Sequence, residues 1–201
     1  MATKGKKPAT HLDRVTVETR EEWRAWLAAN HGQAESIWLV TYKKGASKPY
    51  LSYDEIVEEA LCFGWVDSLP RKLDDERTMR LLSPRKPKSA WSKVNKERIA
   101  KLEREGLMAP AGAEKIAAAK RDASWSFLDD VETLAMPPDL AEALTRHPPA
   151  TENFNAFPRS AKRGILGWIK LAKRPETRAK RVEETARLAA LNQRANHPQK
   201  S

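Results

Sequence analysis

This chain of 201 residues has one cysteine, Cys62, four scattered histidines and no long apolar run. A single cysteine cannot form an internal disulfide bond, so the chain fits a reducing compartment, and we expect it in the cytoplasm. No stretch approaches the roughly 20 apolar residues that a membrane-spanning helix needs, so we expect no membrane span. The N-terminal sequence MATKGKKPATH is basic and no apolar run follows it, so we expect no secretory signal peptide.

The same scarcity argues against several kinds of metal or catalytic site. His11, His31, His147 and His197 are not at ligand spacing from one another, and with one cysteine no zinc site is predicted. The sequence has neither common glycine-rich phosphate-binding loop and no complete catalytic motif. Cys62 lies on the apolar side of a predicted helix, which favours a core position over a nucleophile. We therefore predict no metal, no cofactor and no catalytic residue.

Charge, by contrast, is abundant and unevenly placed. The net charge is +10, but residues 70–106 carry a net +6 and residues 159–201 a net +9, whereas 107–158 carry a net −4. Basic blocks of this kind attract nucleic acid, anionic lipid or acidic proteins, although a solvated helix face gives the same pattern. We expect the partner to be an anionic ligand, a nucleic acid or an acidic protein. The pattern does not indicate an oligomeric state.

Apolar spacing predicts an α+β fold, with a small antiparallel sheet packed with helices and then an all-helical C-terminal module. Ser52 and Glu55 form a capping box at the start of one helix. Either Ser89 or Ser92 caps the helix that ends near Glu105. In the first part the predicted strands are 36–43, 65–73 and 77–83, and the predicted helices are 21–29, 53–63, 92–105 and 110–121.

The second part contains four predicted helices and the domain boundaries follow from composition. The helices are 138–146, 152–157, 161–172 and 175–192. The predicted organisation is a disordered basic tail (1–12), an α+β domain (13–122), an acidic linker (123–136), a helical module (137–192) and a second disordered tail (193–201).

Long segments of the chain carry a family resemblance. The first half contains WLAANH, SIWLVTYKK, SYDEIVEEALCFGWVDS and LSPRKPKSAWSKVNKERIAKLEREGLM, and the second contains PPDLAEAL and SAKRGILGWIKLAKRPETRAKRVEE. In this order they resemble the bacterial YdeI/OmpD-associated family, also called the bacteriocin-protection family, over residues 15–192. Residues 137–192 resemble its OmdA-type module. The resemblance implies a role in tolerating bacteriocins or other antimicrobial stress, and it implies no particular activity, cofactor or catalytic residue.

The segment SPRKPKSAWSKVN, which begins at Ser83, is the strongest binding candidate. An arginine offers a planar fork for phosphate or carboxylate, serines at a helix start leave free amides, and a tryptophan can stack on a ring. Alternatively, the tryptophan belongs to the core and the cations are solvated. The candidate binding residues here are Arg85, Lys88, Ser89, Trp91 and Asn95.

Two further groups are weaker candidates. Arg178 and Arg181 lie three residues apart and would form one cationic face of the last helix, a pattern that also resembles a helix-turn-helix. Asp67 and Arg71, close after Trp65, could line a small-molecule pocket, or they could make cross-strand pairs and turn bonds in a hairpin.

These observations lead to three hypotheses. The first is a non-enzymatic, cytoplasmic stress- or bacteriocin-protection protein that binds an anionic ligand or partner through its basic blocks. The second is a nucleic-acid-binding protein, whose affinity would fall steeply with salt. The third is an enzyme with a small-molecule pocket near Trp65, Asp67 and Arg71.

Overall fold

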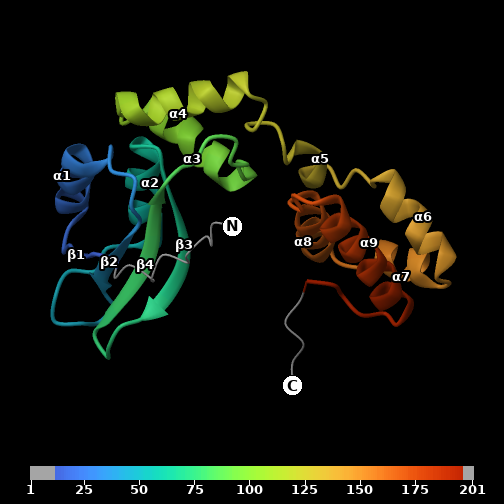
Figure 1. Ribbon diagram of the computed structural model, residues 1–201. Helices are drawn as coiled ribbons and strands as arrows, with labels where there is room; N and C mark the ends of the chain where they lie inside the picture. The colour runs from blue at the N-terminus through green and yellow to red at the C-terminus, as the bar shows by residue number, and fades with distance from the viewer. Residues whose placement is uncertain (1–11, 197–201) are drawn as a thin grey trace, which may run out of the picture. The chain divides into compact units, whose positions relative to one another are not determined.

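The computed structural model describes residues 12–196, shown as coloured ribbon in Figure 1. The chain divides into two compact units, with the boundary between Trp125 and Ser126. Each unit has a separate hydrophobic core and is described by itself. The two predicted tails fall mainly on residues 1–11 and 197–201, which lie outside the described residues.

The N-terminal unit is built on a four-stranded sheet. Its strands are β1 (Arg14–Thr16), β2 (Ile37–Tyr42), β3 (Trp65–Lys72) and β4 (Arg77–Pro84), in the order β1-β2-β4-β3. The predicted antiparallel pairing is confirmed for β2, β4 and β3. The strand β1 was not predicted, because three residues are too short for a periodic pattern. It pairs in parallel with β2, so the sheet is mixed.

A β-bulge interrupts the pairing of β3 with β4. Asp67 pairs with Leu82 and Pro70 pairs with Arg80, so β3 has one residue more than β4 between these two positions. An extra residue reverses the alternation of side chains for the rest of the strand. The bulge therefore decides which face of the sheet each later side chain of β3 occupies.

Four helices complete this unit, and each matches a predicted helix. They are α1 (Arg20–Asn30), α2 (Tyr53–Cys62), α3 (Lys93–Arg104) and α4 (Pro110–Arg121). The capping box is confirmed: Ser52 N donates to Glu55 Oε2 at 2.8 Å, and Glu55 N donates to Ser52 Oγ at 3.3 Å. Of the two serines proposed to cap α3, it is Ser92 that does so, accepting from Asn95 N.

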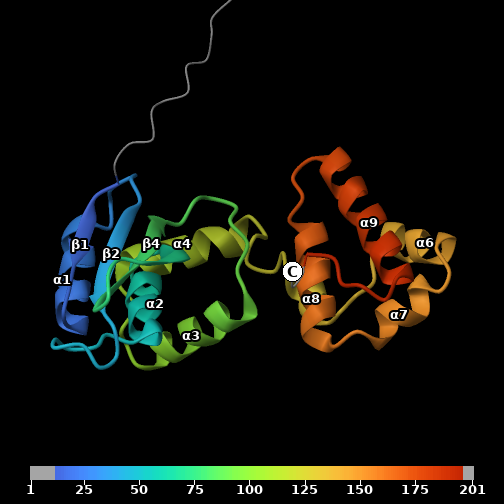
Figure 2. The same ribbon diagram turned by 90° about the horizontal axis from the view of Figure 1, so that it is seen from below.

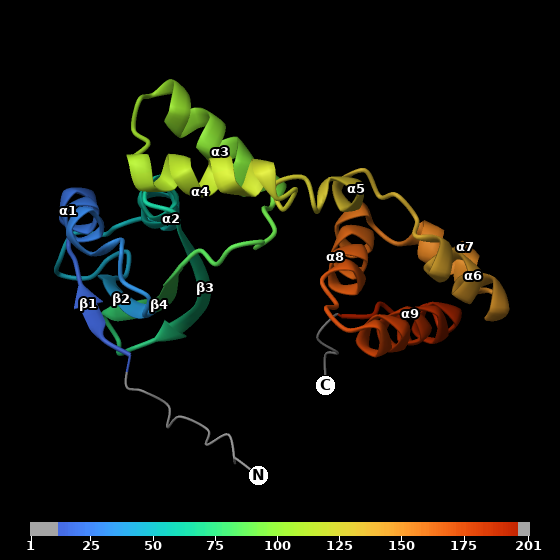
Figure 3. The same cartoon turned by 45° about the horizontal axis from the view of Figure 1, so that its top comes forward.

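The core of this unit lies between the helices and one face of the sheet, and α3 and α4 pack on α2 (Figure 3). Trp23, Trp65 and Trp91 are almost completely buried in it. Cys62 is also buried there, as predicted, and this burial raises the pKa of its thiol to about 11. The thiol is therefore protonated and unreactive at neutral pH.

A buried ion network joins three of these helices. Glu58 and Glu59 on α2 are 6% and 2% exposed. Arg20 Nε donates to Glu59 Oε1 at 2.7 Å, and its Nη2 lies 3.3 Å from Glu58 Oε2. Arg24 donates to Glu59 Oε2, and Lys101 of α3 donates to Glu58 Oε1, each at 2.7 Å. Each buried carboxylate thus has two cationic partners, as burial of charge requires.

The C-terminal unit is all-helical, as predicted. Its helices are α5 (Asp129–Glu132), α6 (Pro138–Arg146), α7 (Ala150–Ala156), α8 (Arg159–Lys170) and α9 (Pro175–Ala190). Helix α9 packs against α6, α7 and α8 (Figure 2). The short helix α5 falls within the expected linker 123–136, and its Val131 is buried in the core of this unit. Ala195, at the start of the expected C-terminal tail, is buried there as well.

No helix among residues 12–196 is both long enough and apolar enough to cross a membrane.

Candidate anion-binding site

The side chain of Arg85 lies inside the N-terminal unit, just after β4. Its backbone N–H donates to Gly64 O at 2.9 Å, which fixes the chain where it leaves the sheet. The guanidinium carbon lies 3.6 Å from the ring centre of Trp91, and Nη1 donates to Ala90 O at 3.1 Å. Arg85 is 5% exposed and Trp91 is 1% exposed. The arginine is therefore held in place by stacking and by one backbone carbonyl.

Among residues 12–196, no carboxylate forms an ion pair with Arg85. Its Nε is buried without a hydrogen-bond acceptor. Burial lowers the pKa of Arg85 to about 10, an effect that the more distant Asp67 carboxylate partly opposes. The group is still a cation at neutral pH. A buried cation with an unsatisfied donor is costly, so it points to a partner that the protein itself does not supply.

A cavity of about 80 Å³ lies at this arginine. Two segments line it: the loop from Arg85 to Trp91, and the end of α4 with the residues that follow. Its charged lining residues are Arg85, Lys86, Lys88, Lys115 and Asp122, a net charge of +3. Cations that converge on one small cavity attract an anion.

Ser124 adds a second polar atom to the lining. The residue is 6% exposed, and its Oγ makes no hydrogen bond of good geometry. It lies beside the Asp122 carboxylate, whose pKa it helps to lower, while Ser124 N donates to Asp122 Oδ1 at 2.9 Å. Ser124 thus places a buried hydroxyl beside the Asp122 carboxylate in the lining of the cavity.

The backbone is strained at both lining segments. Lys88 has φ of 58° and Ala123 has φ of 61°, in the left-handed region where glycine is usual. Lys88 follows Pro87 in a turn in which Ser89 N and Ser89 Oγ both donate to the Lys86 carbonyl, at 3.3 and 2.6 Å. Strain of about 1–3 kcal/mol per residue persists where the surroundings determine the conformation, and it is concentrated at functional sites.

The structure brings together most of the residues proposed for this segment. Arg85, Lys88, Ser89 and Trp91 all line the cavity. The ring of Trp91 belongs to the core and is covered by Arg85, so it is not free to stack on a base. Asn95 does not line the cavity; its Oδ1 accepts a hydrogen bond from Arg98 at 3.3 Å.

The group near Trp65 is not brought together in this way. Asp67 accepts hydrogen bonds from Arg80 Nη1 and Tyr53 Oη, both at 3.2 Å, on the helix-covered face of the sheet. Arg71 lies on the opposite face, with its guanidinium 4.8 Å from the ring centre of Trp38. The bulge separates these two side chains. Trp65 is fully buried, and its indole donates to His31 O at 3.1 Å.

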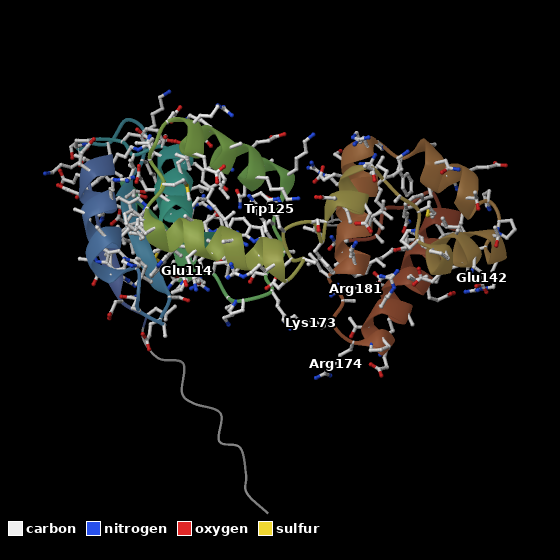
Figure 4. All side chains as sticks on the ribbon, turned by 90° about the horizontal axis from the view of Figure 1, so that it is seen from above. Glu114, Trp125, Glu142, Lys173, Arg174 and Arg181 are labelled. Atoms are coloured by element: carbon white, nitrogen blue, oxygen red, sulfur yellow. The ribbon has the colours of Figure 1, made fainter. Side chains whose placement is uncertain are left out.

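The two arginines of α9 make structural contacts within the C-terminal unit. Arg178 forms two hydrogen bonds with Asp139 of α6, at 2.7 and 2.9 Å, and this pairing lowers the pKa of the Asp139 carboxyl. Arg181 lies over the ring of Trp168 and donates to its carbonyl. Lys173 and Arg174, by contrast, occupy the connection between α8 and α9 (Figure 4).

Sequence reasoning missed the three polar lining residues that lie outside the basic segment. Lys115, Asp122 and Ser124 lie on α4 or just after it, some 30 residues from Arg85 in sequence, where no motif marks them. Trp125 comes next, near the end of α4 (Figure 4), and its ring centre lies 5.2 Å from that of Trp91. Trp125 is partly buried and packs against the core of the N-terminal unit, next to Ser124 of the cavity lining.

A metal-binding site requires a cluster of side chains that can bind the ion. Among the residues that the structure describes, no three His, Cys, Asp or Glu side chains are grouped so that they could hold a metal ion.

The fold and the site together define a two-unit α+β protein with a small cationic cavity in its N-terminal unit. Residues 15–115 match the model of a domain of unknown function, DUF8412. Residues 133–192 match the family described as bacteriocin-protection, YdeI or OmpD-associated (OmdA). The chain therefore belongs to the family of this domain of unknown function, whose model covers half of the chain, and its C-terminal helical unit matches the OmdA family. The sequence resemblance over residues 15–192 is therefore covered by two different family models, and only its C-terminal part matches the OmdA model. No curated protein and no solved structure matches the chain.

Proposed function

We propose that this protein is a non-enzymatic binding protein that takes one anionic group of a ligand or partner into the Arg85 cavity. The observation that carries the proposal is the buried guanidinium without a carboxylate partner. A bound oxyanion would supply the missing counter-charge. Arginine suits this role because its planar fork matches phosphate and carboxylate groups.

The chemistry of the lining supports binding rather than catalysis. Asp122 is the one carboxylate among the described residues that lines the cavity, and the side chain and backbone N–H of Ser124 hold its pKa below the usual range. A carboxylate with a lowered pKa is a weak base, so it is poorly suited to removing a proton near neutral pH. Lysine and arginine side chains can hold an anion in place without any further step.

The other two hypotheses have less support. Arg178 and Arg181, expected to face a nucleic acid, are engaged with Asp139 and Trp168. The enzyme hypothesis required Asp67 and Arg71 to line one pocket, and they lie on opposite faces of the sheet. The cytoplasm is the proposed compartment, because the one cysteine is buried and free. The match of residues 133–192 to the OmdA family makes protection against bacteriocins the proposed biological context.

Replacement of Arg85 by methionine tests the proposal. We expect Arg85→Met to weaken binding of sulfate at least tenfold, because the counter-charge and its hydrogen bonds are lost. The free energy of unfolding should stay the same or rise, since an apolar side chain of similar length replaces an unpaired buried cation. Binding is measured by titrating sulfate into the labelled protein at constant ionic strength and following the ¹H–¹⁵N NMR spectrum, including the arginine Nε–H signals.

A second arginine provides the matched control. Arg71 also stacks on a tryptophan, Trp38. It lies on β3, on the face of the sheet that the helices do not cover. Arg71→Met makes the same change in net charge and should leave sulfate binding unchanged. Equal loss of sulfate binding in both variants would mean that the loss results from the lower net charge and not from a site at Arg85. Full sulfate binding by Arg85→Met would exclude the cavity as the site.

A further inference from the structure

We propose that the anionic group is the dianionic terminal phosphate of a phosphomonoester. This inference rests on the proposed function and adds the class of ligand. It follows from the charge of the cavity, from the directions of its donors and from its size.

The charge of the lining favours a dianion over a carboxylate. Four cationic side chains and one carboxylate line the cavity, a net charge of +3. The three lysines have exposed side chains, so solvent and salt screen their attraction for an anion. The attraction of Arg85 is screened less, because its side chain is buried. Each attraction scales with the charge of the ligand, so a group of charge −2 gains about twice as much as a carboxylate.

The donors approach the cavity from two separate segments. Arg85 and the turn that contains Lys88 come from the connection between β4 and α3, whereas Lys115 comes from α4. One edge of the guanidinium is already occupied by the Ala90 carbonyl, and one face is covered by Trp91. A tetrahedral phosphate has oxygens that point in several directions and can accept from both segments. A planar carboxylate accepts mainly in its own plane.

The size of the cavity indicates a terminal group. A cavity of about 80 Å³ holds one oxyanion, whereas pockets that enclose a drug-sized ligand measure roughly 300–1,000 Å³. The rest of the ligand must therefore lie outside. A phosphodiester carries two ester substituents that would both have to extend out of the cavity, whereas a phosphomonoester carries only one.

The pH dependence of binding separates these classes. A phosphomonoester loses its second proton near pH 6, so the dianion fraction falls about tenfold between pH 7.5 and pH 5.0. The charged lining groups are Arg85, Lys86, Lys88, Lys115 and Asp122, and no histidine is among them. Arginine, lysine and aspartate side chains ordinarily keep their charge over this range, so the ligand alone titrates.

The experiment is an NMR titration of the full chain with four probes at pH 7.5 and pH 5.0, at constant ionic strength. We expect methyl phosphate to bind at pH 7.5 and to bind about tenfold more weakly at pH 5.0. Sulfate, which is a dianion at both values, should bind equally at both. Acetate and dimethyl phosphate should bind at least tenfold more weakly than methyl phosphate at pH 7.5.

The outcomes distinguish failure of this inference from failure of the proposed function. Arg85-dependent binding of acetate or dimethyl phosphate as strong as that of methyl phosphate would overturn the phosphomonoester class and leave an anion site. Binding of methyl phosphate that does not change with pH would have the same meaning. If no probe shows binding that depends on Arg85, both proposals fail.

A variant of Lys88 adds a second, independent check. Lys88→Asn removes one lining charge but suits the left-handed backbone, which asparagine tolerates better than most residues. We expect several-fold weaker binding of methyl phosphate and a smaller loss for acetate, because the dianion responds more strongly to each charge. Equal losses for the two probes would contradict selection by charge.

Discussion

Replacement of Gly112 by alanine is expected to destabilise the N-terminal unit by about 3 kcal/mol, the upper part of the usual range for overpacking. Gly112 lies in the first turn of α4, where this helix crosses the end of α2. A β-carbon there would lie 2.2 Å from Cys62 O and 2.8 Å from Leu61 O. Both are backbone atoms that cannot rotate away, and Ala109 N also donates to Cys62 O at 3.2 Å. The two helices would therefore have to separate.

The measurement is chemical unfolding followed by tryptophan fluorescence. Six of the seven tryptophans lie in the N-terminal unit, so this signal reports mainly on that unit. Gly164→Ala is the control, because Gly164 is an exposed position of α8 where an added β-carbon would have no neighbouring atom within 4 Å. That substitution favours the C-terminal unit by roughly 0.5–1 kcal/mol, the ordinary helix preference for alanine, and should leave the fluorescence transition of the N-terminal unit unchanged. A Gly112→Ala protein as stable as the parent would refute the close approach of α4 to α2.

Removal of Arg20 is expected to cost the N-terminal unit about 2 kcal/mol. The side chain bridges Glu58 and Glu59, which are both buried, so its loss leaves each carboxylate with one cationic partner instead of two. Breaking a fully buried ion pair costs about 3–5 kcal/mol. The expected value is lower, because the Arg20 side chain is 29% exposed and because Arg24 and Lys101 remain.

The same unfolding experiment on Arg20→Ala measures this cost. Lys48→Ala is the matched control, because Lys48 pairs with Glu18 at 3.1 Å and the two side chains are 50% and 34% exposed. An exposed pair contributes about 0–1 kcal/mol, so the control should unfold almost like the parent. If both variants lose the same small amount, the network on α2 contributes no more than a surface ion pair.

Local features of the sequence predicted the local structure well. The capping box of Ser52 and Glu55 depends only on residues three apart in one helix, and it forms as predicted. The strands β3 and β4 follow from β-branched and apolar residues on either side of an acidic turn, and they pair as predicted. The proposed residues Arg85, Lys88, Ser89 and Trp91 of the basic segment after β4 lie close together because they are close in sequence. Their use in binding stays a prediction.

The burial of Arg85 was beyond the reach of sequence reasoning. An arginine between two prolines and several lysines has the composition of an exposed loop. It is buried because Trp91 is required by the core and provides a surface on which the guanidinium stacks. Glu58 and Glu59 are similar, since adjacent glutamates on a helix ordinarily face water, and they are buried here by cations from α1 and α3.

The sequence by itself determined the α+β class, the helices and strands, the family and the composition of the basic segment, since each depends on residues close together in the chain. The tertiary structure alone decided which polar side chains meet. A one-residue bulge placed Asp67 and Arg71 on opposite faces, and the packing of α4 on α2 brought Ser124 to the cavity at Arg85. The positions of these side chains depend on contacts between segments that are distant in sequence. The spacing of apolar residues along one chain does not reveal such contacts.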